Sequence, residues 1–158
     1  MTQDFFHGFA LNAVDAKSRL SIPAAFREVV ERRSDARSIV LAPHERARCL
    51  VGYDKNRAVR LQGQLETRFD GQYDDSRDDF ARLTFGLTEN VPYDANGRII
   101  LSPIMKEFGE IDGLAFFLAA GDYFEVWNPQ VYLAERAERD PRGARLVKLL
   151  LTQRGEGA

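Results

Sequence analysis

The chemically most distinctive pattern in the chain is an aspartate followed four positions later by an arginine, and it occurs twice. Asp15 and Arg19 form the first pair, and Asp94 and Arg98 form the second. Each pair lies at a predicted strand–turn–strand corner, where the aspartate can accept backbone N–H groups and shape the turn. The arginine carries a planar fork of donors that suits phosphate or guanine O6 and N7. One interpretation is a repeated DNA-binding surface, and the other is that each Asp–Arg pair only stabilises its own turn.

The residues around the two pairs match over longer blocks, which indicates an internal repeat. Residues 15–23 read DAKSRLSIP and residues 94–103 read DANGRIILSP. Downstream matches are looser but keep the same order of strand, turn, strand, short helix, strand, strand and helix. The elements expected in the two copies are strands at 38–42, 49–54, 114–119 and 124–128, and helices at 24–31, 55–69, 104–108 and 129–139.

The two turns differ in their chemistry. Asn96-Gly97 predicts a tight type I′ hairpin, in which both central residues need a positive φ. Lys17-Ser18 is weaker turn chemistry, because neither residue enters that region easily. Gly97 is accordingly a candidate turn-shaping residue, together with the two aspartates. After the second turn, the run 99–101 predicts a strand that is buried on both faces.

Two further helices are predicted outside the matched blocks. Ser76, with Asp79 three residues later, is typical of a helix N-cap and its acidic first turn. Asp140-Pro141 is typical of the start of a last helix. The expected organisation is a first repeat at 5–54, a helical connection at 55–80, a second repeat at 81–130 and a C-terminal helical segment at 131–158.

Composition narrows the class of protein. The chain has 158 residues, of which 44% are hydrophobic, enough for a real core. No apolar run approaches the ~20 residues of a membrane span, and the N-terminus does not resemble a secretory signal. The single cysteine, Cys49, excludes an internal disulfide framework and suits a reducing cytoplasm. These features predict a soluble intracellular protein that does not enter the membrane.

The charge of the chain limits how it could bind DNA. A net charge of −2 argues against binding by overall electrostatic attraction. Residues 1–53 carry eight Lys and Arg against six Asp and Glu, whereas the rest of the chain is acidic. Binding to DNA would therefore require basic residues gathered on one surface, with several subunits contributing.

An enzyme is the first alternative class, and the sequence argues against it. His7 and His44 have no partners at metal-ligand spacing, so neither a metal nor another cofactor is expected. Cys49 lies in an apolar strand pattern, where an inert buried thiol is expected rather than a nucleophile. The acidic residues at 74–79 are expected to form a solvated run before a helix.

The doubled motif resembles the MraZ family of bacterial regulators. The resemblance rests on residues 15–27, 94–101 and the aromatic strand at 124–127, and it covers roughly residues 5–140. It implies a mostly β, α+β fold with short helices. Two tandem swapped-hairpin β-barrel repeats of the AbrB and SpoVT type would be arranged about a pseudo-two-fold axis.

The same resemblance implies a function and a set of contact residues. Family members are sequence-specific DNA-binding transcription regulators, usually repressors, that bind direct repeats upstream of the division and cell-wall gene cluster containing their own gene. They form ring-shaped homo-oligomers in the cytoplasm, on the nucleoid. Carried over to this chain, Arg19 is the best candidate for a DNA contact, with Lys17 beside it and Arg98 in the second copy. Ser18 stands where the family usually has glycine, which puts the tightness of the first turn in doubt. Ser102 stands where the first copy has a proline, which suggests that the second copy serves assembly more than DNA binding.

A protein-interaction module, such as an antitoxin that binds its partner with a related hairpin fold, is the second alternative. Antitoxins usually add a disordered tail to one small domain, whereas this chain has two copies and only a short tail after residue 152. A basic stripe in the last helix could bind a partner, but a solvated face is its simpler interpretation. The stripe consists of Arg139, Arg142, Arg145 and Lys148.

Overall fold

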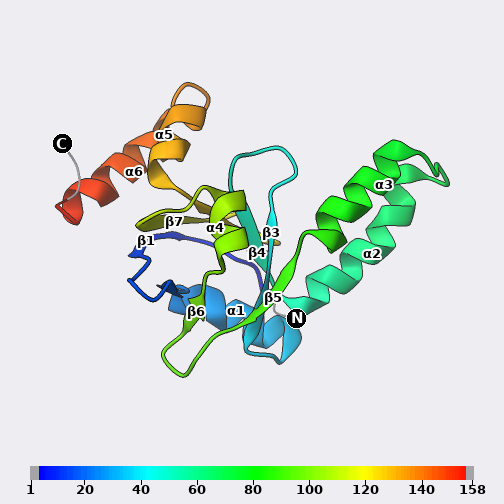
Figure 1. Cartoon of the computed structure of the whole chain (residues 1–158), viewed down its shortest axis with the longest axis horizontal. Coiled ribbons are helices and arrows are strands. Elements are labelled where there is room, and N and C mark those ends of the chain that lie inside the picture. The colour runs from blue at the N-terminus through cyan, green and yellow to red at the C-terminus, as the bar shows by residue number, and fades with distance from the viewer. Residues whose placement is uncertain (1–3, 156–158) are drawn as a thin grey trace.

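The computed structural model describes residues 4–155 and shows a mixed α+β fold (Figure 1). Six strands form one antiparallel sheet in the order β1-β7-β8-β4-β3-β5, and β2 pairs with β6 in a second, two-stranded sheet. The strands are β1 (Phe9–Ala13), β2 (Arg19–Ser21), β3 (Ser38–Pro43), β4 (Leu50–Tyr53), β5 (Glu89–Pro92), β6 (Arg98–Ile100), β7 (Leu114–Ala119) and β8 (Phe124–Trp127).

Helices flank the sheet and extend from it at both ends. Figure 1 shows α2 and α3 projecting as an arm on one side, and α5 and α6 packed at the opposite side. The helical segments are α1 (Ala24–Ser34), α2 (Lys55–Phe69), α3 (Asp75–Ala81), a π-helical turn η1 (Arg82–Gly86), α4 (Pro103–Gly109), α5 (Pro129–Arg136) and α6 (Pro141–Gln153). None of these helices is long and apolar enough to cross a membrane.

The strand pairs join the two halves of the chain. β1 of the first half pairs with β7 of the second, and β5 of the second half pairs with β3 of the first. β4 pairs with β8, and β2 pairs with β6. The strands β1 to β4 of the first half correspond in order to β5 to β8 of the second half. If each strand is replaced by its counterpart, the same set of pairings results. Each half therefore supplies strands that the other half needs to complete the sheet.

The expected hairpins are not formed in the simple way, because the two strands beside each turn belong to different sheets. At the first turn, the flanking segments are joined by a bridge from Val14 to Leu20, by the bond from the Asp15 N–H to the Arg19 carbonyl and by a side-chain bond from Asn12 to the Ser21 carbonyl, but they form no strand ladder. β1 instead pairs with β7, and β2 with β6. A simple hairpin and the observed pairing with strands of the other half both satisfy the same backbone N–H and C=O groups, and both keep the same alternation of buried and exposed side chains. The local sequence pattern therefore does not distinguish the two arrangements.

Two details of the second turn also differ from expectation. The expected type I′ turn is wrong, because Gly97 has a positive φ of 78° but Asn96 does not. The bond from the Gly97 N–H to the Asp94 carbonyl closes an ordinary turn that is followed by a left-handed residue. The expectation that 99–101 is buried on both faces is also wrong, because Ile100 is 66% exposed. A two-stranded sheet turns one face to the core and the other to solvent, and Ile100 lies on the second face.

The core occupies both faces of the large sheet. On one face, the rings of Phe6, Phe26 and Phe124 meet at centroid distances of 4.9–5.9 Å. On the other face, Trp127 packs at 4.8 Å from Tyr132 of α5, and both belong to a cluster that includes residues of α6. Burial on both sides explains why β7 is a continuous apolar run.

Most of the predicted helices are present with shifted ends. α2 covers the expected range, whereas α1 is longer and α5 shorter than expected. The N-cap of α3 is Asp74, whose side chain accepts the N–H of Arg77, and not Ser76. Asp140 caps α6 as expected. Cys49 is buried, as expected, and burial raises the pKa of its thiol far above the usual value.

Candidate nucleic-acid interface

The first turn is organised by the carboxylate of Asp15. Its Oδ1 accepts the backbone N–H groups of Lys17 (2.9 Å) and Arg19 (2.8 Å), and its Oδ2 accepts Nε of Arg19 at 2.7 Å. The N–H of Ser18 donates to the Asp15 carbonyl at 2.9 Å. Ser18 adopts a left-handed conformation with a φ of 63°, so the turn closes tightly although the residue at this position is not glycine.

The second turn repeats these contacts and adds one, because Nη2 of Arg98 also lies 3.1 Å from Oδ2 of Asp94. Oδ1 of Asp94 accepts the N–H groups of Asn96 (2.9 Å) and Arg98 (3.0 Å), and Oδ2 accepts Nε of Arg98 at 3.1 Å. The N–H of Gly97 donates to the Asp94 carbonyl at 2.9 Å. The two Asp-x-x-x-Arg motifs are therefore equivalent in structure as well as in sequence.

The hydrogen bonds keep both aspartates ionised. The pKa of Asp15 lies below its usual value because of the backbone N–H of Arg19, the Arg19 side chain and the N–H of Lys17. The pKa of Asp94 is lowered chiefly by the backbone N–H of Arg98. In the first turn the hydrogen bond to Asp15 uses Nε of Arg19, so the terminal guanidinium nitrogens remain available to a ligand.

The two arginines share one face of the small sheet. In the register of β2 and β6, Arg19 lies opposite Ile100, and Ser21 lies opposite Arg98. Residues directly opposite in an antiparallel pair point to the same side. Leu20 and its partner point the other way and are buried. Arg19 and Arg98 therefore lie diagonally on a single outward face, with an exposed isoleucine between them.

Backbone hydrogen bonds also tie the two turns to each other. The carbonyl of Ser18 accepts the N–H of Leu101 at 2.8 Å, and the carbonyl of Gly97 accepts the N–H of Ile22 at 2.9 Å. We refer to residues 15–22 and 94–101 together as the paired-turn surface. Its two Asp–Arg pairs form one continuous unit rather than two independent hairpin tips.

Three further cations adjoin the paired-turn surface. Lys17 is exposed within the first turn, whereas Arg27 and Lys106 approach the turns from α1 and α4. None of the three is ion-paired with a carboxylate within residues 4–155. Residues 15–22 and 94–101 themselves carry three basic side chains against two carboxylates, and Arg27 and Lys106 lie beside them, in a chain whose net charge is −2. No sequence pattern marks Arg27 and Lys106 as part of this surface, because only the packing of the helices brings them to the turns.

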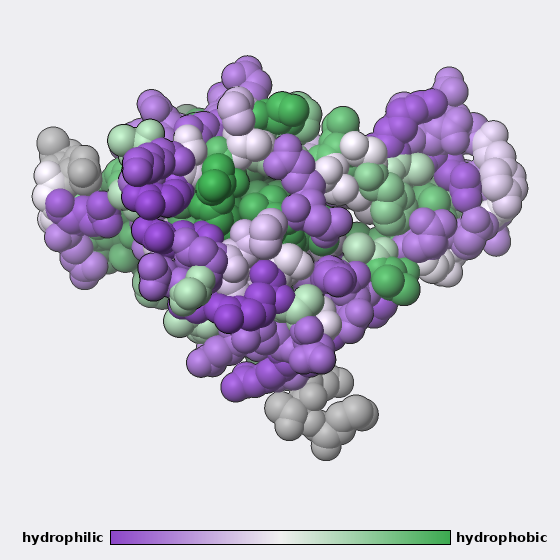
Figure 2. All heavy atoms as spheres, turned by 60° about the horizontal axis from the view of Figure 1, so that its bottom comes forward, coloured by the Kyte–Doolittle hydropathy of each residue, from purple (hydrophilic) through white to green (hydrophobic). Residues whose placement is uncertain are grey.

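Hydrophilic groups predominate on the face of the molecule turned forward in Figure 2, and hydrophobic groups form separate smaller patches. Surfaces that bind DNA are more polar and more positively charged than those that bind protein. The local excess of positive charge at the paired-turn surface is therefore the feature that best fits a nucleic-acid ligand.

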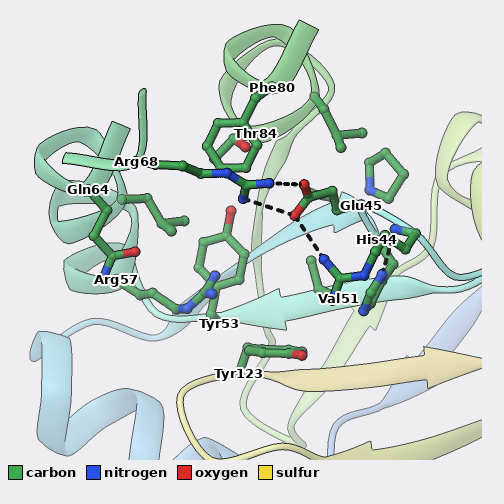
Figure 3. Close-up of a pocket in the computed structure, with 15 residues that line it drawn as sticks. His44, Glu45, Val51, Tyr53, Arg57, Gln64, Arg68, Phe80, Thr84 and Tyr123 are labelled. Atoms are coloured by element: carbon green, nitrogen blue, oxygen red, sulfur yellow. Dashed lines mark hydrogen bonds and ion pairs between the residues drawn. The ribbon is translucent and has the colours of Figure 1, made fainter. Parts of the chain in front are cut away.

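A cavity beside the α2–α3 arm is less suited to a ligand. It has a volume of about 310 Å³ and lies between the α2–α3 arm and the strands β3 and β4 (Figure 3). Arg68 binds both carboxylate oxygens of Glu45, at 2.6 and 3.2 Å. Arg57 lies 4.6 and 4.9 Å from the ring centres of Tyr53 and Tyr123. Both arginines are thus already engaged by protein groups.

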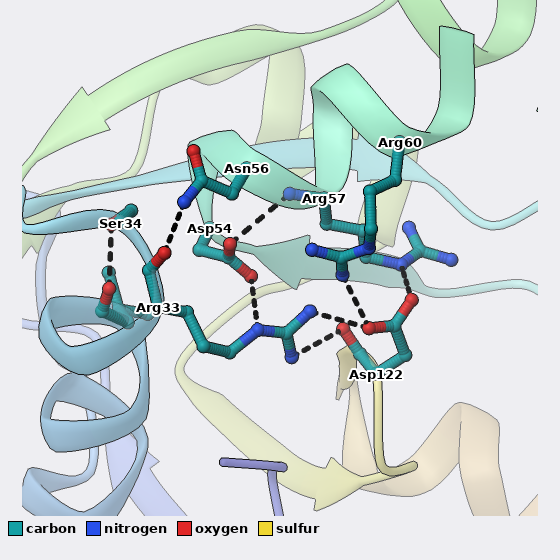
Figure 4. A network of polar contacts seen from close by, with 8 residues as sticks. Arg33, Ser34, Asp54, Asn56, Arg57, Arg60 and Asp122 are labelled. Carbon is teal, nitrogen blue, oxygen red and sulfur yellow. Dashed lines mark hydrogen bonds and ion pairs between the residues drawn. The ribbon is translucent and has the colours of Figure 1, made fainter. Parts of the chain in front are cut away.

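A second polar network anchors the arm to the body of the molecule (Figure 4). Arg33, Arg57 and Arg60 donate to the carboxylate of Asp122 at 2.5, 2.8 and 2.7 Å. Burial alone would raise the pKa of Asp122, but the hydrogen bonds from the arginines outweigh it and lower the pKa. Asp54 is fully buried, caps α2 and pairs with Nε of Arg33 at 3.1 Å. These charges have a structural role in holding α2.

The histidines and the basic stripe show no feature of a functional site. Nδ1 of His44 accepts the N–H groups of Arg46 and Ala47, and its Nε2 lies 3.4 Å from Glu125. Within the described residues, no cluster of three or more His, Cys, Asp or Glu side chains could hold a metal ion. The four basic residues of the stripe, Arg139, Arg142, Arg145 and Lys148, are all exposed to solvent.

Comparison with known proteins identifies the family of the chain. No family model matches it. Over 142 residues the chain is 30% identical to the transcriptional regulator MraZ of Coxiella burnetii, covering 87% of this chain and 91% of that protein. It is 27% identical over 147 residues to the protein of that name from Saccharophagus degradans, covering 93% and 97%. With the one from Rickettsia akari it shares 31% identity over 120 residues, covering 76% and 78%. The chain belongs to the MraZ family, whose members carry the name transcriptional regulator.

Proposed function

We propose that this protein is a sequence-specific DNA-binding transcription regulator that contacts DNA through the paired-turn surface. The observation that carries the proposal is the placement of Arg19 and Arg98 on one outward face, each oriented by an ionised aspartate. A two-stranded β-ribbon fits the major groove, and arginine is the commonest reader of guanine there. Lys17, exposed and without a carboxylate partner among residues 4–155, adds a contact for phosphate.

The proposal includes the finer features expected of the family. The protein acts as a repressor that binds direct repeats upstream of the division and cell-wall genes, including its own gene, and works in the cytoplasm on the nucleoid. The exchange of strands between halves supports two tandem swapped-hairpin repeats of the AbrB and SpoVT type. Their boundaries would be 5–54 and 81–130, with helical segments at 55–80 and 131–158.

Self-association into a ring follows from the charge of the chain. One subunit with a net charge of −2 and a single paired-turn surface neutralises few phosphates and should bind weakly. A ring places identical surfaces side by side in similar orientations, which suits direct repeats. Once one surface is bound, each further contact is intramolecular, with an effective concentration that reaches roughly the millimolar range.

The decisive experiment is a gel-shift titration of the upstream DNA with Arg19→Ala. Losing one bidentate base contact should cost roughly 1–3 kcal/mol per site, and Arg98→Ala should cost less. Arg82→Ala is a matched control, because Arg82 also forms an exposed ion pair, with Asp79 at 3.2 Å, but lies on the arm. A folded Arg19→Ala protein with wild-type affinity would overturn the assignment of the site. Failure of the wild-type protein to bind the DNA would favour the interaction-module alternative.

The assembly proposal has a separate test. Light scattering should report a closed oligomer well above a dimer. Affinity should fall steeply when one repeat is deleted or when the spacing is shifted by half a helical turn. A monomer that binds a single repeat with full affinity would contradict the proposal.

A further inference from the structure

We propose that each turn of the paired-turn surface is positioned by a cation from the opposite half of the chain. Lys106 on α4 positions the first turn through Ser18, and Arg27 on α1 positions the second turn through Gly97. The consequence for DNA affinity rests on the function proposed above, whereas the positioning itself concerns the free protein.

The contact of Lys106 with the first turn is direct. Its Nζ donates to Oγ of Ser18 at 2.5 Å, although the two residues are far apart in sequence. The base of the lysine is fixed, because Met105 beside it is buried and the Lys106 N–H donates to the Ser102 carbonyl at 2.9 Å. Ser18 has a left-handed φ of 63°, a conformation in which a residue other than glycine needs support from its surroundings.

Arg27 contacts the second turn by packing over Gly97 and not by a hydrogen bond to it. Its Nε donates to the carbonyl of Ile22 at 3.1 Å, which holds the guanidinium against the backbone. The guanidinium covers Gly97 so closely that a Cβ at this position would overlap it. Arg27 and Lys106 hold matching positions in the two copies, each on the short helix after the turn. Each helix therefore places a cation on the turn of the other half, Lys106 by a hydrogen bond to Ser18 and Arg27 by packing over Gly97.

This support of each turn by the opposite half, which we call crossed support, sets the direction in which Arg19 and Arg98 leave the turns. Ser18 directly precedes Arg19, and Gly97 directly precedes Arg98. Small rotations at these left-handed positions would redirect the guanidinium groups, and a misplaced group loses its bidentate geometry. Lys106 acts here as a positioning residue, through Oγ of Ser18, and does not itself contact a base.

Amide hydrogen exchange of the free protein tests the crossed pattern. Lys106→Met should speed exchange of the amides at 15–19 roughly five- to tenfold, the effect of losing one hydrogen bond to a charged group, and leave those at 94–98 unchanged. Arg27→Met should speed exchange of the amides at 94–98 by a smaller factor, because it removes packing over Gly97 and no hydrogen bond to that turn, and it should leave those at 15–19 unchanged. Equal acceleration of both segments by either variant, or wild-type exchange in both, would overturn the proposal. Lys106→Arg keeps a donor and should restore most of the protection, which separates positioning from loss of the fold.

DNA titrations then separate positioning from direct phosphate contact. Lys106→Met and Ser18→Ala should each weaken binding by roughly fivefold, and the double variant should be no weaker than either single one. The dependence of affinity on salt should stay as in the wild type. Additive losses, or a salt slope reduced by about one unit per contact, would show that Lys106 binds phosphate and would overturn the positioning role.

Controls identify which proposal fails. Lys55→Met, at an exposed lysine that begins α2, should leave the affinity unchanged. If Arg19→Ala has no effect on binding, the proposed function fails while the exchange experiment still tests the crossed support. If Arg19→Ala abolishes binding but Lys106→Met changes neither exchange nor affinity, only the present inference fails.

Discussion

The two turns of the paired-turn surface reach one geometry with different residues. Both aspartates make the same pattern of backbone and guanidinium bonds. The first turn places a serine at the left-handed position and an exposed lysine before it, whereas the second has Gly97 and the neutral Asn96. The shape of the turn is thus set by the Asp-x-x-x-Arg pattern and by tertiary support rather than by glycine alone. Because of the added cation, the first turn is expected to contribute more to DNA binding.

The largest expected difference between the turns concerns their tolerance of a Cβ atom. Gly97→Ala should lower the free energy of unfolding by roughly 2–3 kcal/mol, because alanine is strained at a φ of 78° and its Cβ would displace Arg27. Ser18→Ala should cost about 1 kcal/mol, because a Cβ is already accommodated there and only the hydrogen bond with Lys106 is lost. Urea denaturation measures both values.

Gly113→Ala provides the control for that comparison. Gly113 has open space around it and no positive φ, so alanine should be close to neutral there. If Gly97→Ala costs no more than Ser18→Ala, the second turn does not depend on its glycine and the contrast between the turns is wrong.

The second difference is the charge at matching positions of the turns. Lys17→Asn should weaken DNA binding by roughly fivefold near physiological salt and reduce the salt slope by about one unit per contact, because one phosphate contact is lost. Asn96→Lys, the reciprocal exchange, should strengthen binding and steepen the slope. Fluorescence anisotropy titrations at several salt concentrations measure both.

The outcome of this exchange shows how the turns share the DNA. Equal and opposite changes would show that the two turns contact DNA alike. If Asn96→Lys leaves binding unchanged while Lys17→Asn weakens it, only the first turn faces the phosphate backbone.

The smallest expected effect is a difference in pH dependence. The pKa of Asp15 and of Asp94 is lower in the folded protein than the usual 3.8, so each carboxylate contributes stability that is present above that value and is lost as the pH falls through its folded pKa. The melting temperature of Asp15→Asn should therefore be lower than that of the wild type at neutral pH, and the difference between the two proteins should shrink in acid.

The two aspartates can be distinguished by their arginine partners. Arg19 donates Nε to Asp15 at 2.7 Å, whereas Arg98 donates to Asp94 at 3.1 Å. Arg19→Gln should therefore raise the carboxyl pKa of its partner more than Arg98→Gln does, as followed by carbon NMR titration. A larger change at Asp94 would contradict the difference in geometry.

Much of the candidate site was predictable because its chemistry is local. An aspartate at the start of a turn bonds the N–H groups that follow it whatever the rest of the chain does, so the roles of Asp15 and Asp94 in shaping the turns could be predicted. The N-caps of α2 and α6 and the burial of Cys49 follow from equally short-range patterns. The contacts of Arg27 and Lys106 gave no such signal, because a lone cation on a short helix usually faces solvent.

The sequence by itself determined the duplication, the order of elements and the Asp-x-x-x-Arg turns, because each depends on neighbouring residues. Only the tertiary structure decided that β2 pairs with β6 and β1 with β7, which places Arg19 and Arg98 on one face and leaves Ile100 exposed. A hairpin and an exchanged pair of strands satisfy the same backbone groups with the same alternation of side chains. The choice between them depends on how much apolar surface the two halves bury together, and that quantity exists only when the whole chain is folded.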